Sequence, residues 1–106
     1  MSLSAEAVEA ALGDSGFTVV EGDTNGPFGS WYLTLEHDPR LRLTFDGRDG
    51  WLTIEWETDR FFGDLRQWDP LWVGKSSEDL KVPMVMRMLE STRAFAEASA
   101  EPRGRR

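Results

Sequence analysis

The stretch RLRLTFDGRDGWLTIEWE, residues 40–57, decides the fold because it reads as two strands joined by a tight turn. Apolar and polar residues alternate on both sides of residues 47–50, as they do in strands that bury one face. If residues 47–50 form the loop of an antiparallel hairpin, Leu43 lies opposite Ile54. A slip of one residue would turn every apolar side chain to the wrong face, so a buried face fixes this register.

The same register separates the two tryptophans of this stretch. Trp51 and Trp56 are an odd number of positions apart, which puts their side chains on opposite faces of a strand. Trp56 shares the apolar face and is predicted to join the core. Trp51 shares the polar face with Glu55 and Glu57, so it is predicted to be exposed.

The alternation continues toward the N-terminus. Residues 31–36, WYLTLE, are predicted to pair with residues 40–45 and to place Tyr32 on the same polar face as Trp51. Residues 16–22 are predicted as a further strand, and LWV, residues 71–73, as a short edge strand. The expected fold is α+β, with a mainly antiparallel, four- to five-stranded meander sheet.

An N-terminal helix is predicted over residues 5–12. Ser4 is a favourable N-cap, and Leu3 and Val8 have the spacing of a hydrophobic staple. Gly13 is predicted to end the helix in the left-handed conformation that glycine accepts most easily.

A long C-terminal helix is predicted over residues 83–101, with Pro83 at its first position. Residues 76–81, SSEDLK, precede it as a capped turn. Both helices are expected to pack on one face of the sheet, within a single domain of residues 1–101 that a disordered basic tail, residues 102–106, follows. The apolar stripe of the long helix comprises Met84, Val85, Met88, Leu89, Thr92, Phe95, Ala96 and Ser99, and the residues facing away are Met86, Arg87, Glu90, Arg93 and Glu97.

Charge limits the classes of partner. The chain has a net charge of −7, and three of its twelve basic residues lie in the tail, so residues 1–101 carry −10. An acidic body repels nucleic acid and anionic membranes and suits a basic protein partner. The sequence contains no cysteine, no run of about 18 apolar residues and no secretory signal pattern. We therefore expect a cytoplasmic protein.

Motifs that would indicate catalysis or metal binding fail on inspection. GKS, residues 74–76, resembles part of a phosphate-binding loop, but the glycine required five positions earlier is Asp69. A calcium loop starting at Asp23 would need glycine at Phe28. The one histidine, His37, is predicted to be a solvated loop residue. We expect no metal and no cofactor, and an enzyme is the least favoured class of function.

The candidate binding residues are aromatic and acidic. Tyr32, Trp51, Glu55 and Glu57 share the polar sheet face, and residues 58–75, which show no clean period, add two tryptophans. Aromatic side chains with a polar rim are typical of protein interfaces. We predict binding of a protein partner, and the alternative is a small-molecule site built on residues 58–75. The predicted site residues are Tyr32, Trp51, Glu55, Glu57, Trp68 and Trp72.

The order of the elements resembles that of a known class of protein. A helix that ends in a glycine turn, then GFTVVEGD, a three-stranded meander and a long closing helix resemble small acidic type III secretion chaperones and related bacterial sensory-regulator domains. That resemblance implies a protein-binding α+β domain, often a homodimer. The chain is also similar to small, acidic, Trp-rich immunity proteins that neutralise secreted bacterial toxins, which are not catalytic.

Overall fold

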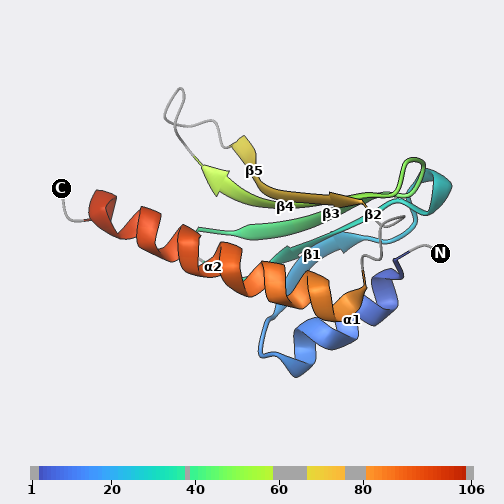
Figure 1. Ribbon diagram of the computed structural model, residues 1–106, viewed down its shortest axis with the longest axis horizontal. Helices are drawn as coiled ribbons and strands as arrows, with labels where there is room; N and C mark the ends of the chain where they lie inside the picture. The colour runs from blue at the N-terminus through green and yellow to red at the C-terminus, as the bar shows by residue number, and fades with distance from the viewer. Residues whose placement is uncertain (1–2, 38, 59–66, 76–80, 105–106) are drawn as a thin grey trace.

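A computed structural model describes residues 3–37, 39–58, 67–75 and 81–104 (Figure 1). One five-stranded antiparallel sheet, with its strands in sequence order, packs against two helices that lie on the same side of it (Figure 1). The predicted α+β meander is therefore confirmed. Its elements are α1 (Ala5–Asp14), β1 (Val19–Asp23), a short 3-10 helix (Pro27–Gly29), β2 (Trp31–Leu35), β3 (Leu41–Asp46), β4 (Trp51–Thr58), β5 (Gln67–Lys75) and α2 (Val82–Gly104).

The predicted strand register is confirmed. Leu43 lies opposite Ile54 and Arg42 lies opposite Glu55 in the pairing of β3 with β4. β2 pairs with β3 so that Leu33 also faces Leu43. The side chains of the three central strands are therefore in register, and their aliphatic residues lie on one face of the sheet.

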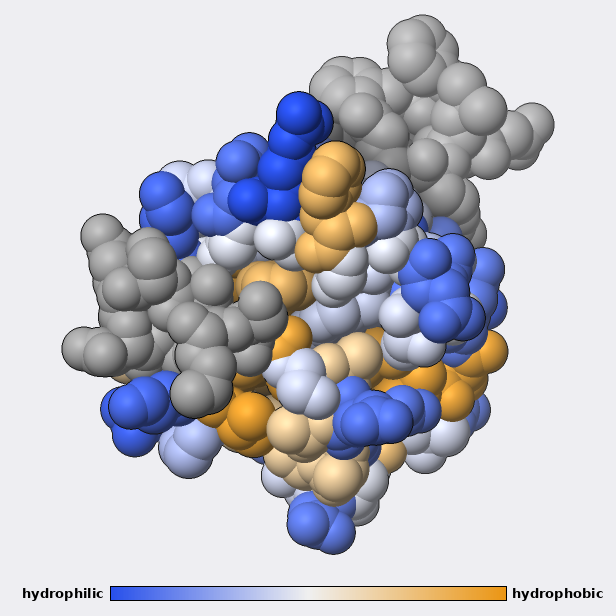
Figure 2. All heavy atoms as spheres, turned by 90° about the vertical axis from the view of Figure 1, so that its right-hand side faces the viewer, coloured by the Kyte–Doolittle hydropathy of each residue, from blue (hydrophilic) through white to orange (hydrophobic). Residues whose placement is uncertain are grey.

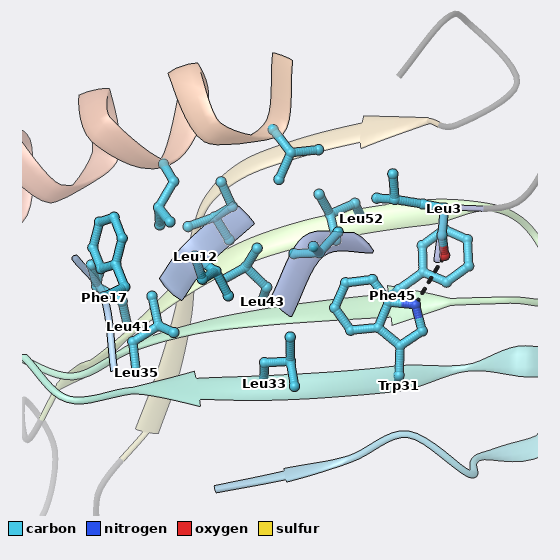
Figure 3. Close-up of a cluster of buried hydrophobic side chains, with 14 of the residues drawn as sticks. Leu3, Leu12, Phe17, Trp31, Leu33, Leu35, Leu41, Leu43, Phe45 and Leu52 are labelled. Carbon is cyan, nitrogen blue, oxygen red and sulfur yellow. Dashed lines mark hydrogen bonds between the residues drawn. The ribbon is translucent and has the colours of Figure 1, made fainter. Parts of the chain in front are cut away.

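The core lies between that aliphatic face and the two helices (Figure 3). Trp31 stacks on Phe45 with ring centroids 5.6 Å apart, and its indole Nε1 donates a hydrogen bond of 3.1 Å to the carbonyl oxygen of Leu3 (Figure 3). Trp56 faces the same way, as predicted, but is only half-buried, with its ring 5.8 Å from that of Phe95. The buried apolar residues are Leu3, Val8, Leu12, Phe17, Trp31, Leu33, Leu35, Leu41, Leu43, Phe45, Leu52, Ile54, Val85, Leu89 and Ala96.

Helix α1 begins as predicted, with Ser4 as its N-cap, but ends two residues later than expected. The prediction that Gly13 ends the helix is wrong, because Gly16 has the positive φ of +88°. Gly16 N–H donates to the Gly13 carbonyl at 3.1 Å, and Phe17 N–H donates to the Leu12 carbonyl at 2.9 Å. This pair of bonds is a Schellman motif. Leu12 and Phe17, the two residues joined by the second of these bonds, both belong to the buried core, which explains why the later glycine is used.

Strand β5 is longer than the edge strand predicted at residues 71–73. Successive residues of β4 lie opposite Pro70 and Trp72, so Leu71 is an extra residue that forms a β-bulge. Trp68 and Trp72 would share a face in a regular strand, but the bulge turns them to opposite faces. A proline and a bulge are both tolerated at a sheet edge. Together they interrupt the alternation of apolar and polar residues from which this strand could have been predicted.

Helix α2 covers the sheet with most of the predicted stripe. Val85, Leu89, Thr92 and Ala96 are buried, Met88 is half-buried, and Met84 and Phe95 are exposed. The prediction for Met86 is wrong, because that side chain packs against the core. The helix runs through residues 102–104, which were expected to be disordered, and Pro83 is its second residue rather than its first. The side chain of Ser99 and most of the predicted turn at residues 76–81 lie outside the described part.

His37 is not the solvated loop residue that the sequence predicted. Its side chain is only 13% exposed. One ring nitrogen lies 2.7 Å from the carbonyl oxygen of Pro39, and the other lies 2.9 Å from a carboxylate oxygen of Glu97. The sequence could not show this contact, because Glu97 is on α2 and meets the loop between β2 and β3 only in the folded chain.

Candidate functional site

The sheet face opposite the helices is the candidate site, and we call it the open face. No helix in the described part of the chain packs on it (Figure 1). The strand pairing places on this face Glu21, Asp23, Tyr32, Thr34, Arg42, Thr44, Trp51, Thr53, Glu55, Glu57, Trp68, Val73 and Lys75. It therefore carries aromatic and charged groups where the helix-covered face carries aliphatic ones.

Arg42 organises the centre of the open face. Its guanidinium carbon lies 4.1 Å from the ring centroid of Trp68 and 5.5 Å from that of Tyr32. Its Nε donates a 3.0 Å hydrogen bond to Glu55 Oε1, and Thr44 Oγ1 donates to the same oxygen at 2.9 Å. We call these five residues the Arg42 cluster.

The local sequence explains how the cluster assembles from four strands. Tyr32 on β2 lies opposite Thr44 on β3. Arg42, two positions before Thr44, is therefore the diagonal neighbour of Tyr32 on the same face. Glu55 lies directly opposite Arg42 on β4. Trp68 on β5 pairs with Glu57, one step beyond Glu55 on the same face, so its large ring can reach across β4 to Arg42.

Burial distinguishes this cluster from ordinary surface pairs. The Arg42 and Glu55 side chains are 25% and 17% exposed, so their ion pair is partly shielded from water. Thr34, directly opposite Arg42, is only 1% exposed, and its hydroxyl has no hydrogen-bond partner in the described structure. A cation near an aromatic ring contributes about 0.5–1 kcal/mol at exposed sites and about 2 when desolvated. The side chains of the Arg42 cluster are therefore held in place by their own contacts, while the rings of Tyr32 and Trp68 are only half-buried.

Trp51 lies apart from the Arg42 cluster, where β4 leaves the loop of residues 47–50. It is 42% exposed, and the Lys75 ammonium lies 5.2 Å from its ring centroid. The loop of residues 47–50 lies on the right-hand side of Figure 1, and Figure 2 shows the molecule from that side. Hydrophobic residues appear there in small groups between hydrophilic ones (Figure 2). Scattered apolar residues of this kind are ordinary on a soluble surface.

Five of the six predicted site residues lie on the open face, and Trp72 does not. Trp72 points to the helix-covered side and packs against the core. It lines a groove of about 340 Å³ between β5 and α2, together with Pro70, Leu71, Met88, Ser91, Thr92 and Phe95. Tyr32, Glu55 and Trp68 meet at Arg42, Glu57 is half-buried opposite Trp68, and Trp51 is separate.

Arg42 is not among the predicted site residues, although it lies at the centre of the open face. The alternation of residues 40–45 and the register of the hairpin predict that Arg42 lies on the polar face, opposite Glu55. Its contact with Trp68 was not readable, because the bulge obscured β5. Arginine beside tryptophan and tyrosine is the signal that would have identified it.

The described residues offer no set of three His, Asp or Glu side chains placed to hold a metal ion. Neither helix, over the residues described, is both long and apolar enough to cross a membrane. No protein-family model matches the chain, and searches of curated proteins and of solved structures also found no match.

Proposed function

We propose that the chain is a non-catalytic protein that binds a protein partner through the open face. The observation that supports this most is the Arg42 cluster, which joins Tyr32, Arg42 and Trp68 on a face that no described helix covers. Tryptophan, tyrosine and arginine are the residues most enriched at interface hot spots. Because the cluster is held by its own contacts, little side-chain freedom would be lost on binding.

The charge of the chain favours a basic partner. Residues 1–101 carry a net charge of −10, and Glu21, Asp23, Glu55 and Glu57 lie on the open face. Acidic groups around a docking surface accelerate encounter with a basic protein and disfavour nucleic acid. We place this activity in the cytoplasm, in a chaperone-like or immunity-like role, and a homodimer is the assembly that the chaperone resemblance implies.

A non-catalytic role is supported by the contacts of Glu55. Its Oε1 accepts hydrogen bonds from both Arg42 Nε and Thr44 Oγ1, so this carboxylate is already engaged within the Arg42 cluster. A structural ion pair with Arg42 is sufficient to explain the position of Glu55 on the sheet.

A second candidate function is small-molecule binding in the groove between β5 and α2. Its volume of about 340 Å³ and its lining by Trp72, Met88 and Phe95 favour an apolar ligand, since ligand pockets span about 300–1,000 Å³. This candidate would use the helix-covered side of β5 and would leave the open face unused.

Co-purification under native conditions tests the proposal. The full chain is compared with Trp68→Ala and with Phe28→Ala, a matched control because Phe28 is 69% exposed and has Arg48 5.2 Å from its ring centroid. We expect a protein retained by wild type and Phe28→Ala to bind Trp68→Ala at least about tenfold more weakly, which is 1.4 kcal/mol. Circular dichroism checks that each variant is folded. Equal retention by all three chains would reject the open face.

A further inference from the structure

The outer edge of β1 borders a hollow of about 450 Å³. Residues 19–25 line it along the strand and the turn that follows, Glu9 lines it from α1, and Leu33 lines it from β2. Because β1 is the first strand of the sheet, it has no neighbour on this side within the described structure.

Gly22 keeps the hollow open on the side of the helices. It lies opposite Leu33, which is only 2% exposed. A Cβ atom at Gly22 would lie 3.0 Å from Leu33 Cδ2 and 3.0 Å from the carbonyl oxygen of Tyr32. With no side chain there, the edge presents its backbone to the hollow, and Leu33 lies beneath it.

The two edges of the sheet differ in how well they could accept another strand. β5 carries Pro70, which lacks an N–H group, and a bulge at Leu71, and both features discourage pairing. β1 has a bulge next to Val19, but its following residues, Glu21 to Asp23, pair regularly with β2 and are exposed. An edge strand turns part of its backbone N–H and C=O groups outward. β1 is therefore the more receptive edge.

Charge determines what could pair there. The carboxylates of Glu9, Glu21 and Asp23 line the hollow, and no lysine or arginine is among its lining residues. Two such edges would repel each other, so a second copy of this acidic chain is disfavoured. A strand that carries lysine or arginine would meet complementary charge instead.

We propose that β1 is the docking edge for an extended basic segment of a protein partner, which adds a sixth strand to the sheet by β-augmentation. Its basic side chains face Glu21 and Asp23 on the open face, and the side chains between them are small and apolar and enter the hollow above Gly22 and Leu33. Asp23 lies opposite Tyr32, so this edge continues into the Arg42 cluster. The inference rests on the proposed function in one respect, that the partner is a protein.

The test uses the full chain, isotopically labelled, and a blocked peptide of alternating arginine and valine. We expect amide shifts at Val19 to Asp23 and at Glu9. Methylation of alternate peptide nitrogens should weaken binding, because it removes backbone donors. The double variant Glu21→Gln with Asp23→Asn should weaken it about tenfold, since two charge pairs are lost. The charge-matched control, Asp49→Asn with Glu90→Gln, should bind normally.

Three results would overturn the inference. They are no binding of the arginine–valine peptide, equal loss in both double variants, and no effect of methylation, which would indicate unstructured charge attraction. The two proposals are separable once a natural partner is captured. Loss of the partner with Trp68→Ala but not with the Glu21 and Asp23 variant keeps the open face and rejects the edge. The opposite pattern keeps the edge and rejects the Arg42 cluster.

Discussion

The two faces of the sheet use the same strands for different purposes. Leu43 and Ile54, opposite each other on the helix-covered face, are fully buried at 0% exposed. Arg42 and Glu55, one position away along each strand, are 25% and 17% exposed in their side chains and meet through an ion pair. One step along a strand therefore changes a residue from one packed in the core into one that lies on the open face. The faces should respond differently to substitution.

The largest difference is expected at the centre of β4. Ile54→Ala should lower the free energy of unfolding by about 2–5 kcal/mol, because it removes buried methylenes and leaves a cavity. Thr53→Ala, its neighbour on the open face, should cost less than about 1 kcal/mol. Chemical denaturation measures both values. Equal losses would show that the faces are not divided as described.

The two tryptophans of β4 sharpen the comparison. Trp56 is half-buried against the core, so Trp56→Ala should cost about 2–3 kcal/mol, below the 3–5 of a fully buried aromatic residue. Trp51 is 42% exposed, and Trp51→Ala should cost about 1 kcal/mol or less, chiefly the contact with Lys75. Thermal or urea unfolding of each variant is the measurement. A larger loss at Trp51 would contradict the assignment of faces.

The Arg42 cluster should show energetic coupling on the open face. In a double-mutant cycle, Arg42→Ala and Trp68→Ala should couple by about 0.5–1 kcal/mol, the value of a cation near an aromatic ring. The control cycle pairs Arg42→Ala with Phe95→Ala, which lies on the other side of the sheet and should be additive. Additivity in both cycles would mean that the stacking contributes nothing measurable.

Thr34 lies on the open face but is as buried as a core residue. Its hydroxyl is buried and unpaired within the described structure, so Thr34→Val should raise the free energy of unfolding by about 1 kcal/mol. Thr53→Val, at a half-buried position on the same face, is the control and should change less. A loss of stability with Thr34→Val would mean that the hydroxyl has a partner, such as an ordered water.

The smallest effect is expected from ligands. Added zinc, calcium or ATP should leave the midpoint of thermal unfolding unchanged, since a ligand that binds only the folded state would raise it. The expectation comes from the sequence, which lacks an intact phosphate loop and has a single histidine and no cysteine. A rise of several degrees with any of the three would contradict it.

Alternation made the central strands predictable. In β3, and in β4 from Leu52 to Trp56, every apolar residue is separated from the next by one polar residue, and the loop of residues 47–50 fixes the pairing. Register therefore followed from counting, and so did the opposite orientations of Trp51 and Trp56. Tyr32, Glu55 and Glu57 were assigned to their face by the same count.

The two-residue alternation did not predict the faces of side chains where a β-bulge interrupts a strand. The bulge at Leu71 inserts one residue, so Trp68 and Trp72 take opposite faces although their spacing is even. Contacts between distant elements were also beyond reach, such as His37 with Glu97, or Arg42 with Trp68. These depend on how elements are placed in space, and a single sequence carries no local signal for that.

The presence of glycine at position 74 is explained by the indole ring of Trp72, which lies against it. A Cβ atom at this position would overlap Cη2 of Trp72, so the indole occupies the space that any side chain would need. The glycine of the sequence GKS is therefore matched to a tryptophan two residues before it, rather than to a phosphate. In evolutionary terms the two positions should covary: a relative that replaces Gly74 should also carry a smaller residue at position 72.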